Sequence, residues 1–230
     1  MFLQLKNILT PQEVQTARAL LQAPAAPWRD GRSSAGGQAL AHKRNQQLAQ
    51  DSPEAAQLRA LVLAALQRDA LFFSAALPKR IFNPLFNRYG GDSNFYGDHV
   101  DGAVLRSRYP EQWVRSDLSC TIFLADPDEY EGGELLIREA QGERAIKLPA
   151  GDMVLYPSST VHQVAPVTCG ARIASFFWVE SMVRSLEQRQ LLFQMDMDLL
   201  RLRADVGETA PAVVGLTGTY HNLLRMWADV

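Results

Sequence analysis

Cysteine is scarce in this sequence, with only Cys120 and Cys169 among 230 residues. Two thiols are too few for a disulfide framework or for a metal site built from thiolates. This scarcity is typical of a reducing compartment, so we predict a cytoplasmic location. A disulfide between the two cysteines is the less favoured alternative.

Long apolar runs and an excess of one charge are also lacking. Polar residues interrupt Met1–Asn7, where a signal peptide needs an unbroken apolar stretch, and no segment approaches the roughly 20 apolar residues that cross a bilayer. The formal net charge is -2 and the isoelectric point is about 6.1. We therefore expect neither a nucleic-acid partner nor a membrane partner.

The composition itself is that of an ordinary globular protein, 47% hydrophobic and 21% charged. Disorder and fibrous architectures are therefore not indicated. The chain is long enough for one substantial core, either as a single large domain or as a domain with a helical appendage.

Capping signals predict two helices near the amino terminus. Thr10-Pro11-Gln12-Glu13 and Ser52-Pro53-Glu54 each combine a capping hydroxyl, a proline suited to the first helical position and an early acidic residue. We expect the apolar stripe of the second helix to pack on the outer face of a sheet. Between about Pro24 and Asp51, proline and glycine predict turns with one short strand near Gln38–Ala41.

From Pro78 onward, short β-favouring runs alternate with Gly, Pro and Asp clusters, which is the pattern of an antiparallel sandwich or barrel. We predict a mainly β fold, a double-stranded β-helix (jelly roll) core with the amino-terminal helices packed on it. The predicted strands are Arg80–Tyr89, Phe95–Val100, Asp117–Leu124, Glu134–Ile137, Glu143–Leu148, Met153–Tyr156, Val161–Ala165 and Arg172–Val179.

After Glu180 the strand signals stop and apolar residues recur at helical spacing. We predict a carboxy-terminal helical extension, with helices within about 181–205 and from about 209 to 227. This gives three regions: an amino-terminal helical and irregular support region (1–77), the jelly roll (78–180) and the extension (181–230). The extension could cover the sandwich or form a homodimer contact.

The stretch 97–102 holds the first candidate metal ligands, His99 and Asp101. In an extended segment, residues two apart project to the same face, so the imidazole and the carboxylate can converge. One imidazole and one carboxylate are two of the three ligands of a facial metal triad.

His162, on a later predicted strand, is the candidate third ligand. Taken alone, it would more often be a core or surface histidine, but the jelly-roll background and His99-Val100-Asp101 favour a ligand. Strand alternation places Arg172 on an apolar inner face, where its guanidinium needs an anionic partner. A protein carboxylate could supply that partner, and so could a dicarboxylic ligand lying between the metal and the arginine.

The ordered set His99-x-Asp101, His162 and Arg172 resembles the iron(II)- and 2-oxoglutarate-dependent dioxygenases of the prolyl 4-hydroxylase type. More narrowly, the chain is similar to the bacterial PKHD-type hydroxylases through most of its length, most strongly between about Pro78 and Val179. The matching motifs are Asn87-Arg88-Tyr89, His99-Val100-Asp101-Gly102-Ala103, Arg115-Ser116-Asp117-Leu118-Ser119, Tyr130-Glu131-Gly132-Gly133-Glu134-Leu135 and Gly151-Asp152-Met153-Val154-Leu155-Tyr156-Pro157-Ser158.

The resemblance implies that Fe²⁺ is bound by His99, Asp101 and His162. It further implies that 2-oxoglutarate chelates the iron and pairs its distal carboxylate with Arg172, that Tyr89 hydrogen-bonds this co-substrate, and that L-ascorbate serves as a reductant. The implied reaction hydroxylates a substrate and releases succinate and CO₂. An ordinary strand aromatic is an equal alternative for Tyr89.

The substrate is not indicated by the sequence: a protein side chain and a small molecule are both open, and a link to iron uptake follows from family context alone. The segment 103–116, expected as a loop, could form a lid over the substrate entrance. Two rival functions use the same scaffold. A zinc-dependent hydrolase would leave Arg172 unexplained, and a non-catalytic sensor of metal or 2-oxoglutarate would need no complete triad.

Overall fold

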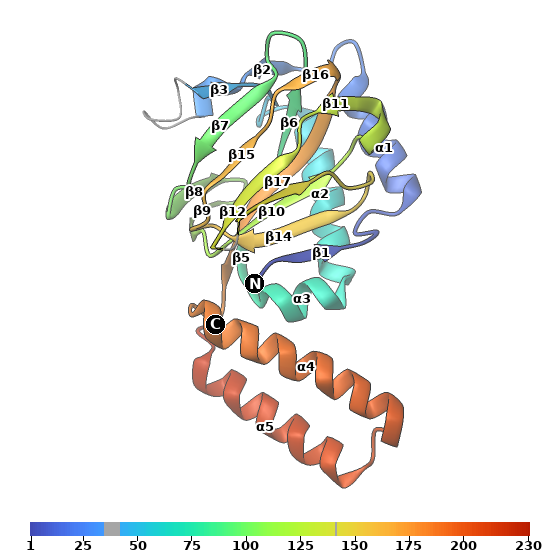
Figure 1. Ribbon diagram of the computed structural model, residues 1–230, viewed down its shortest axis with the longest axis vertical. Coiled ribbons are helices and arrows are strands. Elements are labelled where there is room, and N and C mark those ends of the chain that lie inside the picture. The colour runs from blue at the N-terminus through green and yellow to red at the C-terminus, as the bar shows by residue number, and fades with distance from the viewer. Residues whose placement is uncertain (35–41, 141) are drawn as a thin grey trace.

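The computed structural model describes residues 1–34, 42–140 and 142–230, and its centre is a pair of facing antiparallel sheets (Figure 1). The larger sheet has the strand order β1-β14-β10-β17-β6-β4-β2, with β5 pairing with another part of β17. The smaller sheet has the order β13-β12-β15-β7-β3. The predicted jelly-roll core is thereby confirmed.

The strands of the larger sheet are β1 (Leu3–Leu5), β2 (Trp28–Asp30), β4 (Gln46–Leu48), β5 (Pro78–Ile81), β6 (Leu85–Tyr89), β10 (Leu118–Phe123), β14 (Met153–Pro157) and β17 (Arg172–Ser181). Those of the smaller sheet are β3 (Lys43–Arg44), β7 (Phe95–His99), β12 (Leu135–Glu139), β13 (Gly142–Ile146) and β15 (His162–Val164). Two further pairs are β8 (Val104–Arg108) with β9 (Glu111–Arg115), and β11 (Tyr130–Gly132) with β16 (Val167–Gly170).

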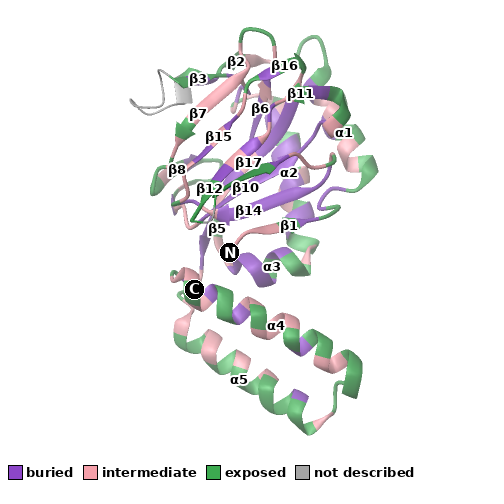
Figure 2. Cartoon of the chain, in the orientation of Figure 1, coloured by how far each residue is buried: buried purple, intermediate pink, exposed green. Residues whose placement is uncertain are grey.

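The amino-terminal helices begin where their capping residues predict. In α1 (Pro11–Gln22), the Thr10 hydroxyl accepts from the Glu13 amide and the Glu13 carboxylate accepts from the Thr10 amide, which is a complete capping box. In α2 (Pro53–Arg68), Ser52 caps the Ala55 amide. Of the two, α2 lies behind the larger sheet, as predicted for the second helix, and α1 packs against α2 (Figure 1). Figure 2 shows that the strands and the sheet-facing residues of α2 are largely buried.

Three sequence predictions need correction. The single strand predicted over Arg80–Tyr89 is two strands, β5 and β6, separated by a break that contains Pro84, whose nitrogen cannot donate to a ladder. The amino-terminal region also contributes strands to both sheets, and α3 (Ala70–Ala76) was not predicted. The strand predicted near Gln38–Ala41 lies outside the described residues. Both cysteines are free, Cys120 buried and Cys169 exposed.

The carboxy-terminal extension is a pair of helices, α4 (Leu186–Val206) and α5 (Pro211–Trp227), that project from one end of the jelly roll (Figure 1). The predicted extension is confirmed, whereas the homodimer through it and the three-region division stay predictions. None of the described helices is long and apolar enough to cross a membrane.

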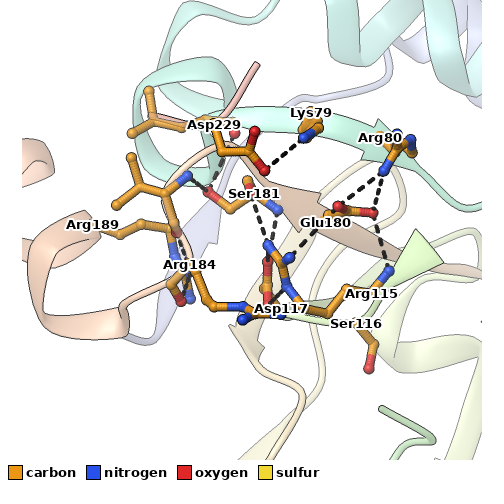
Figure 3. Close-up of polar contacts among 12 residues, drawn as sticks. Lys79, Arg80, Arg115, Ser116, Asp117, Glu180, Ser181, Arg184, Arg189 and Asp229 are labelled. Atoms are coloured by element: carbon orange, nitrogen blue, oxygen red, sulfur yellow. Dashed lines mark hydrogen bonds and ion pairs between the residues drawn. The ribbon is translucent and has the colours of Figure 1, made fainter. Parts of the chain in front are cut away.

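A network of ion pairs fixes the base of this extension to the sheet (Figure 3). The Asp117 carboxylate accepts from Nε and an Nη of Arg115 at 2.7 and 2.8 Å, and from the Ser181 amide at 2.9 Å. The backbone amide of Arg115 donates to Glu180. The network therefore joins β9, β10 and the end of β17 immediately before α4.

Candidate metal centre

His99, Asp101 and His162 converge at one end of the smaller sheet. His99 ends β7, His162 begins β15, and the two are cross-strand partners, while Asp101 lies two residues beyond the end of β7. One potential ligand atom from each of the three side chains lies within 4.8 Å of the others. The structure therefore brings together the three residues that the sequence proposed as a triad.

Both imidazoles are held in the tautomer that a metal needs. Nδ1 of His99 lies 2.8 Å from the Gly97 carbonyl oxygen, and Nδ1 of His162 lies 3.0 Å from that of Thr160. Because a carbonyl only accepts, each Nδ1 carries the proton and each Nε2 presents a lone pair. Burial, and secondarily the neighbouring His162, lowers the pKa of His99 to about 4, which keeps its ring neutral at ordinary pH.

The Asp101 carboxylate is oriented by two serines. The Ser119 hydroxyl donates to Oδ2 of Asp101 at 2.5 Å, and Oγ of Ser158 lies 2.8 Å from Oγ of Ser119. Since Ser119 has one proton, Ser158 is the donor in the second contact. Oδ2 of Asp101 also lies 3.7 Å from Nε2 of His162. The carboxylate is thus fixed beside the free nitrogen of the second imidazole.

Arg172 begins β17 and is 1% exposed. Its guanidinium carbon lies 5.4 Å from the ring centre of Tyr89 and 5.2 Å from that of Phe123. Within the described ranges, no carboxylate forms an ion pair with Arg172, and its Nε has no hydrogen-bond partner. Among the described residues, no protein carboxylate therefore serves as the partner of Arg172. A buried, unpaired guanidinium is very costly, so this position fits an anionic ligand.

Tyr89 is the cross-strand partner of Arg172 and is also buried. Burial raises the pKa of Tyr89, which outweighs the opposing effect of the Arg172 charge. The phenol is therefore a neutral hydroxyl that can donate a hydrogen bond beside the guanidinium. Whether it contacts a co-substrate stays a prediction.

A cleft of about 1360 Å³ contains the triad, Tyr89 and Arg172. Its apolar wall includes Phe82, Phe176 and Trp178, with Trp178 making edge-to-face contacts to the two phenylalanines at 5.1 and 5.7 Å. The segment 103–116, expected as a loop, is instead the β8–β9 hairpin, from which Leu105, Arg106, Arg108 and Tyr109 line the cleft. A lid role for this hairpin stays a prediction.

Sequence reasoning missed a polar wall of the cleft on β3 and β4. Lys43, Asn45 and Gln47 are each at most 8% exposed and line the cleft, whereas the intervening Arg44 and Gln46 lie on the other side. Burial lowers the pKa of Lys43 to about 8. Because the segment Lys43–Gln47 is polar at every position, it carries no alternation of apolar and polar residues that could have predicted strands.

Two family models match the chain. The model of the 2OG-Fe(II) oxygenase superfamily matches residues 84–180, which include the triad, Tyr89 and Arg172. The model of the PKHD-type hydroxylase C-terminal domain matches residues 187–229, which include α5 and most of α4.

Curated relatives match the chain over its whole length. It is 58% identical over 229 residues to a PKHD-type hydroxylase of Verminephrobacter eiseniae and 57% identical over 230 residues to one of Variovorax paradoxus, with 100% of each chain covered. Among solved structures, a Pseudomonas putida prolyl-4-hydroxylase is similar with a TM-score of 0.51 and 20% identity, covering 78% of this chain and 92% of that one. A Trichoplax adhaerens prolyl hydroxylase is similar with a TM-score of 0.55 and 16% identity, covering 83% and 86%. These structural likenesses bear on the fold.

Proposed function

The chain belongs to the PKHD-type hydroxylase family of 2OG-Fe(II) oxygenases, and on that premise we propose that it hydroxylates an organic substrate with Fe²⁺ and 2-oxoglutarate, releasing succinate and CO₂. We assign His99, Asp101 and His162 as the Fe²⁺ ligands. Two neutral imidazoles and one carboxylate are the donor set of non-haem iron oxygenases, which supports this assignment.

Arg172 is the observation that carries the proposal. A buried guanidinium with an unpartnered Nε, in the same cleft as a three-ligand cluster, matches a ligand that has a metal-chelating end and an anionic end. We propose that 2-oxoglutarate is this ligand and that its distal carboxylate binds Arg172 bidentately. Tyr89 donates to the same carboxylate.

The iron, with its co-substrate and dioxygen, supplies the oxidative chemistry that no side chain can provide. The residues of the chain bind the metal and the co-substrate, orient the ligand side chains and exclude water. Gly97 and Thr160 hold the two imidazoles by their Nδ1 protons, and Ser119 fixes the Asp101 carboxylate. The apolar wall of Phe82, Phe176 and Trp178 keeps water away from the reacting groups, which limits unproductive turnover.

The substrate class is left open between a protein side chain and a small molecule. Only the family resemblance supports L-ascorbate as a reductant and a role in iron uptake. A cytoplasmic location is supported only by the scarcity of cysteine.

Two other functions use the same residues. A zinc hydrolase would employ the triad to activate water but has no use for a buried arginine. A non-catalytic sensor would bind 2-oxoglutarate without consuming it. Arg172 disfavours the hydrolase, and the complete triad disfavours the sensor.

The test is succinate formation from 2-oxoglutarate by the purified chain loaded with Fe²⁺ or Zn²⁺, with the Asp101→Ala variant as the control. The proposal expects succinate with iron only and none from the variant. Incubation with a cell extract then identifies the substrate as the peptide or metabolite that gains one oxygen atom. Hydrolysis with zinc alone, without succinate, would show that the chain is a hydrolase instead.

A further inference from the structure

The floor of the cleft around Tyr89 contains several buried polar atoms that lack partners. They are Nδ2 and Oδ1 of Asn45, Oδ1 of Asn87 and Nε of Arg172. Asn45 is 2% exposed and Asn87 is 6% exposed, so bulk water does not satisfy them. Each unsatisfied buried group is costly. The two donors in this set, Nδ2 of Asn45 and Nε of Arg172, call for an acceptor, whereas the two amide oxygens accept only and need a donor such as water.

Strand pairing brings these groups to one face. Asn87 and Tyr89 are two residues apart on β6, and Tyr89 is the cross-strand partner of Arg172 on β17. On the other side, β4 pairs with β6 through Gln47 and Asn87, and Asn45, two residues before Gln47, turns inward with it. Residues two apart and residues opposite each other in a ladder share a face, so all four line the same floor.

The amides surround the Tyr89 hydroxyl. Nδ2 of Asn87 donates to this hydroxyl oxygen in a long contact of 3.5 Å, which leaves the hydroxyl proton free for another acceptor. On its other flank, the Asn45 amide is near enough to lower the pKa of Tyr89 but makes no hydrogen bond of good geometry. The donors therefore have room for an acceptor that lies between them.

The charge of this floor matches one carboxylate. Arg172 supplies a single positive charge, and Asn45, Asn87 and Tyr89 are neutral. Neutral amides orient an anion without competing for it, whereas an aspartate at the same position would pair with Arg172 and occupy the site. The single positive charge of Arg172 therefore matches the single negative charge of one carboxylate, and the neutral side chains beside it offer further hydrogen-bond donors.

We propose that Asn45 and Asn87 determine which 2-oxo acid this enzyme accepts: Asn45 binds the distal carboxylate beside Arg172, and Asn87 is a positioning residue that acts through Tyr89. The inference rests on the proposed function and adds to it a specificity device contributed by the amino-terminal region. The strand pair β4–β6 carries Asn45 to the site, so the length of the accepted acid depends on a segment outside the 2OG-Fe(II) oxygenase match.

Calorimetric titration of the Mn²⁺-loaded chain tests this without turnover. 2-Oxoglutarate reaches the floor, whereas oxalate chelates the same metal but has no distal carboxylate. We expect Asn45→Ala to weaken 2-oxoglutarate about 10-fold and Asn87→Asp to weaken it about 50-fold or more, the size expected for lost hydrogen bonds to a charge and for an internal partner on Arg172. Oxalate affinity should change less than about 2-fold in both.

Three further readings complete the test. Asn45→Ala should also narrow the preference for 2-oxoglutarate over the longer 2-oxoadipate, since a smaller side chain leaves room for one methylene. The ligand-free Asn87→Asp variant should unfold at the same temperature as the wild type or higher, because Arg172 gains a partner. The exposed Asn222→Asp on α5 is the matched control and should bind both ligands normally.

Unchanged 2-oxoglutarate affinity in both variants would overturn the inference, and so would an equal loss of oxalate and 2-oxoglutarate, which indicates a general structural effect. If the proposed function is wrong, the result is different: the wild-type chain then shows no metal-dependent binding of either 2-oxoglutarate or oxalate.

Discussion

Tyr89 and Arg172 face each other across β6 and β17, with the guanidinium carbon 5.4 Å from the centre of the phenol ring. The pair lies on the inner face of the larger sheet, while the metal triad lies at the facing end of the smaller sheet. The two halves of a chelating, dicarboxylic ligand would therefore be held by different sheets. Changes at Arg172 should separate binding of that ligand from stability of the fold.

Arg172→Lys should raise the 2-oxoglutarate concentration needed for half-maximal turnover by about 10- to 100-fold, because a bidentate fork becomes a point charge. Arg172→Met should abolish co-substrate binding yet increase the free energy of unfolding of the ligand-free chain by about 1 kcal/mol, since it removes an unpaired buried charge. Steady-state kinetics and urea unfolding measure the two effects. An unchanged 2-oxoglutarate requirement in the lysine variant contradicts the role given to Arg172.

Ser119→Ala should lower the affinity for Fe²⁺ or Mn²⁺ by about 10-fold, because the Asp101 carboxylate loses the hydroxyl that orients it. The exposed Ser159→Ala is the matched control and should bind metal as the wild type does. Isothermal titration calorimetry with the metal ion measures the affinity of each variant. Equal affinities for the two variants would mean that Ser119 has no part in the metal site.

The metal-free chain should lose stability as the pH falls from about 6.5 towards 4. The pKa of His99 is lowered in the folded chain to about 4, so in this window the unfolded chain binds more protons than the folded one. Stability then rises with pH, and we expect a difference of about 3 kcal/mol between pH 4 and pH 7 from this group. Urea unfolding at several pH values measures it, and His99→Asn should flatten the profile.

Asp117→Asn should destabilise the chain by about 3 kcal/mol, because Arg115 and the Ser181 amide lose a largely buried carboxylate (Figure 3). Glu111→Gln removes the exposed pair with Arg106 and should leave the free energy of unfolding almost unchanged, because solvent screens this pair. Urea unfolding of both variants checks the contrast. Similar changes in the free energy of unfolding for the two variants would show that the network at the base of α4 does not stabilise the fold.

The strands predicted correctly are those in which apolar residues dominate, such as β10, β14 and β17, because burial against helices leaves a legible pattern. The segment Lys43–Gln47 carries no strand pattern because its inward side chains face a polar cleft instead of an apolar core. The alternation of apolar and polar residues that usually marks a half-buried strand is therefore absent. For a related reason the sequence predicts a loop where the β8–β9 hairpin lies: Val104 and Trp113 are exposed, so the alternation that marks a half-buried strand is weak.

The candidate site shows the same division. His99, Asp101, His162 and Arg172 could be chosen from the sequence because their types and spacing belong to one chemistry. Ser119 and Ser158 could not, because their approach to Asp101 depends on how β10 and β14 pair and where β14 ends. Asn45 lacked any signal, since only the pairing of β4 with β6 brings it beside Tyr89.

The measurement that tests the central claim most directly is an anaerobic titration of the chain with Fe²⁺ and 2-oxoglutarate, followed by visible absorption. The account predicts a weak charge-transfer band that saturates at one iron and one co-substrate per chain, and that is absent from Asp101→Ala. No band in the wild-type chain under these conditions would contradict it.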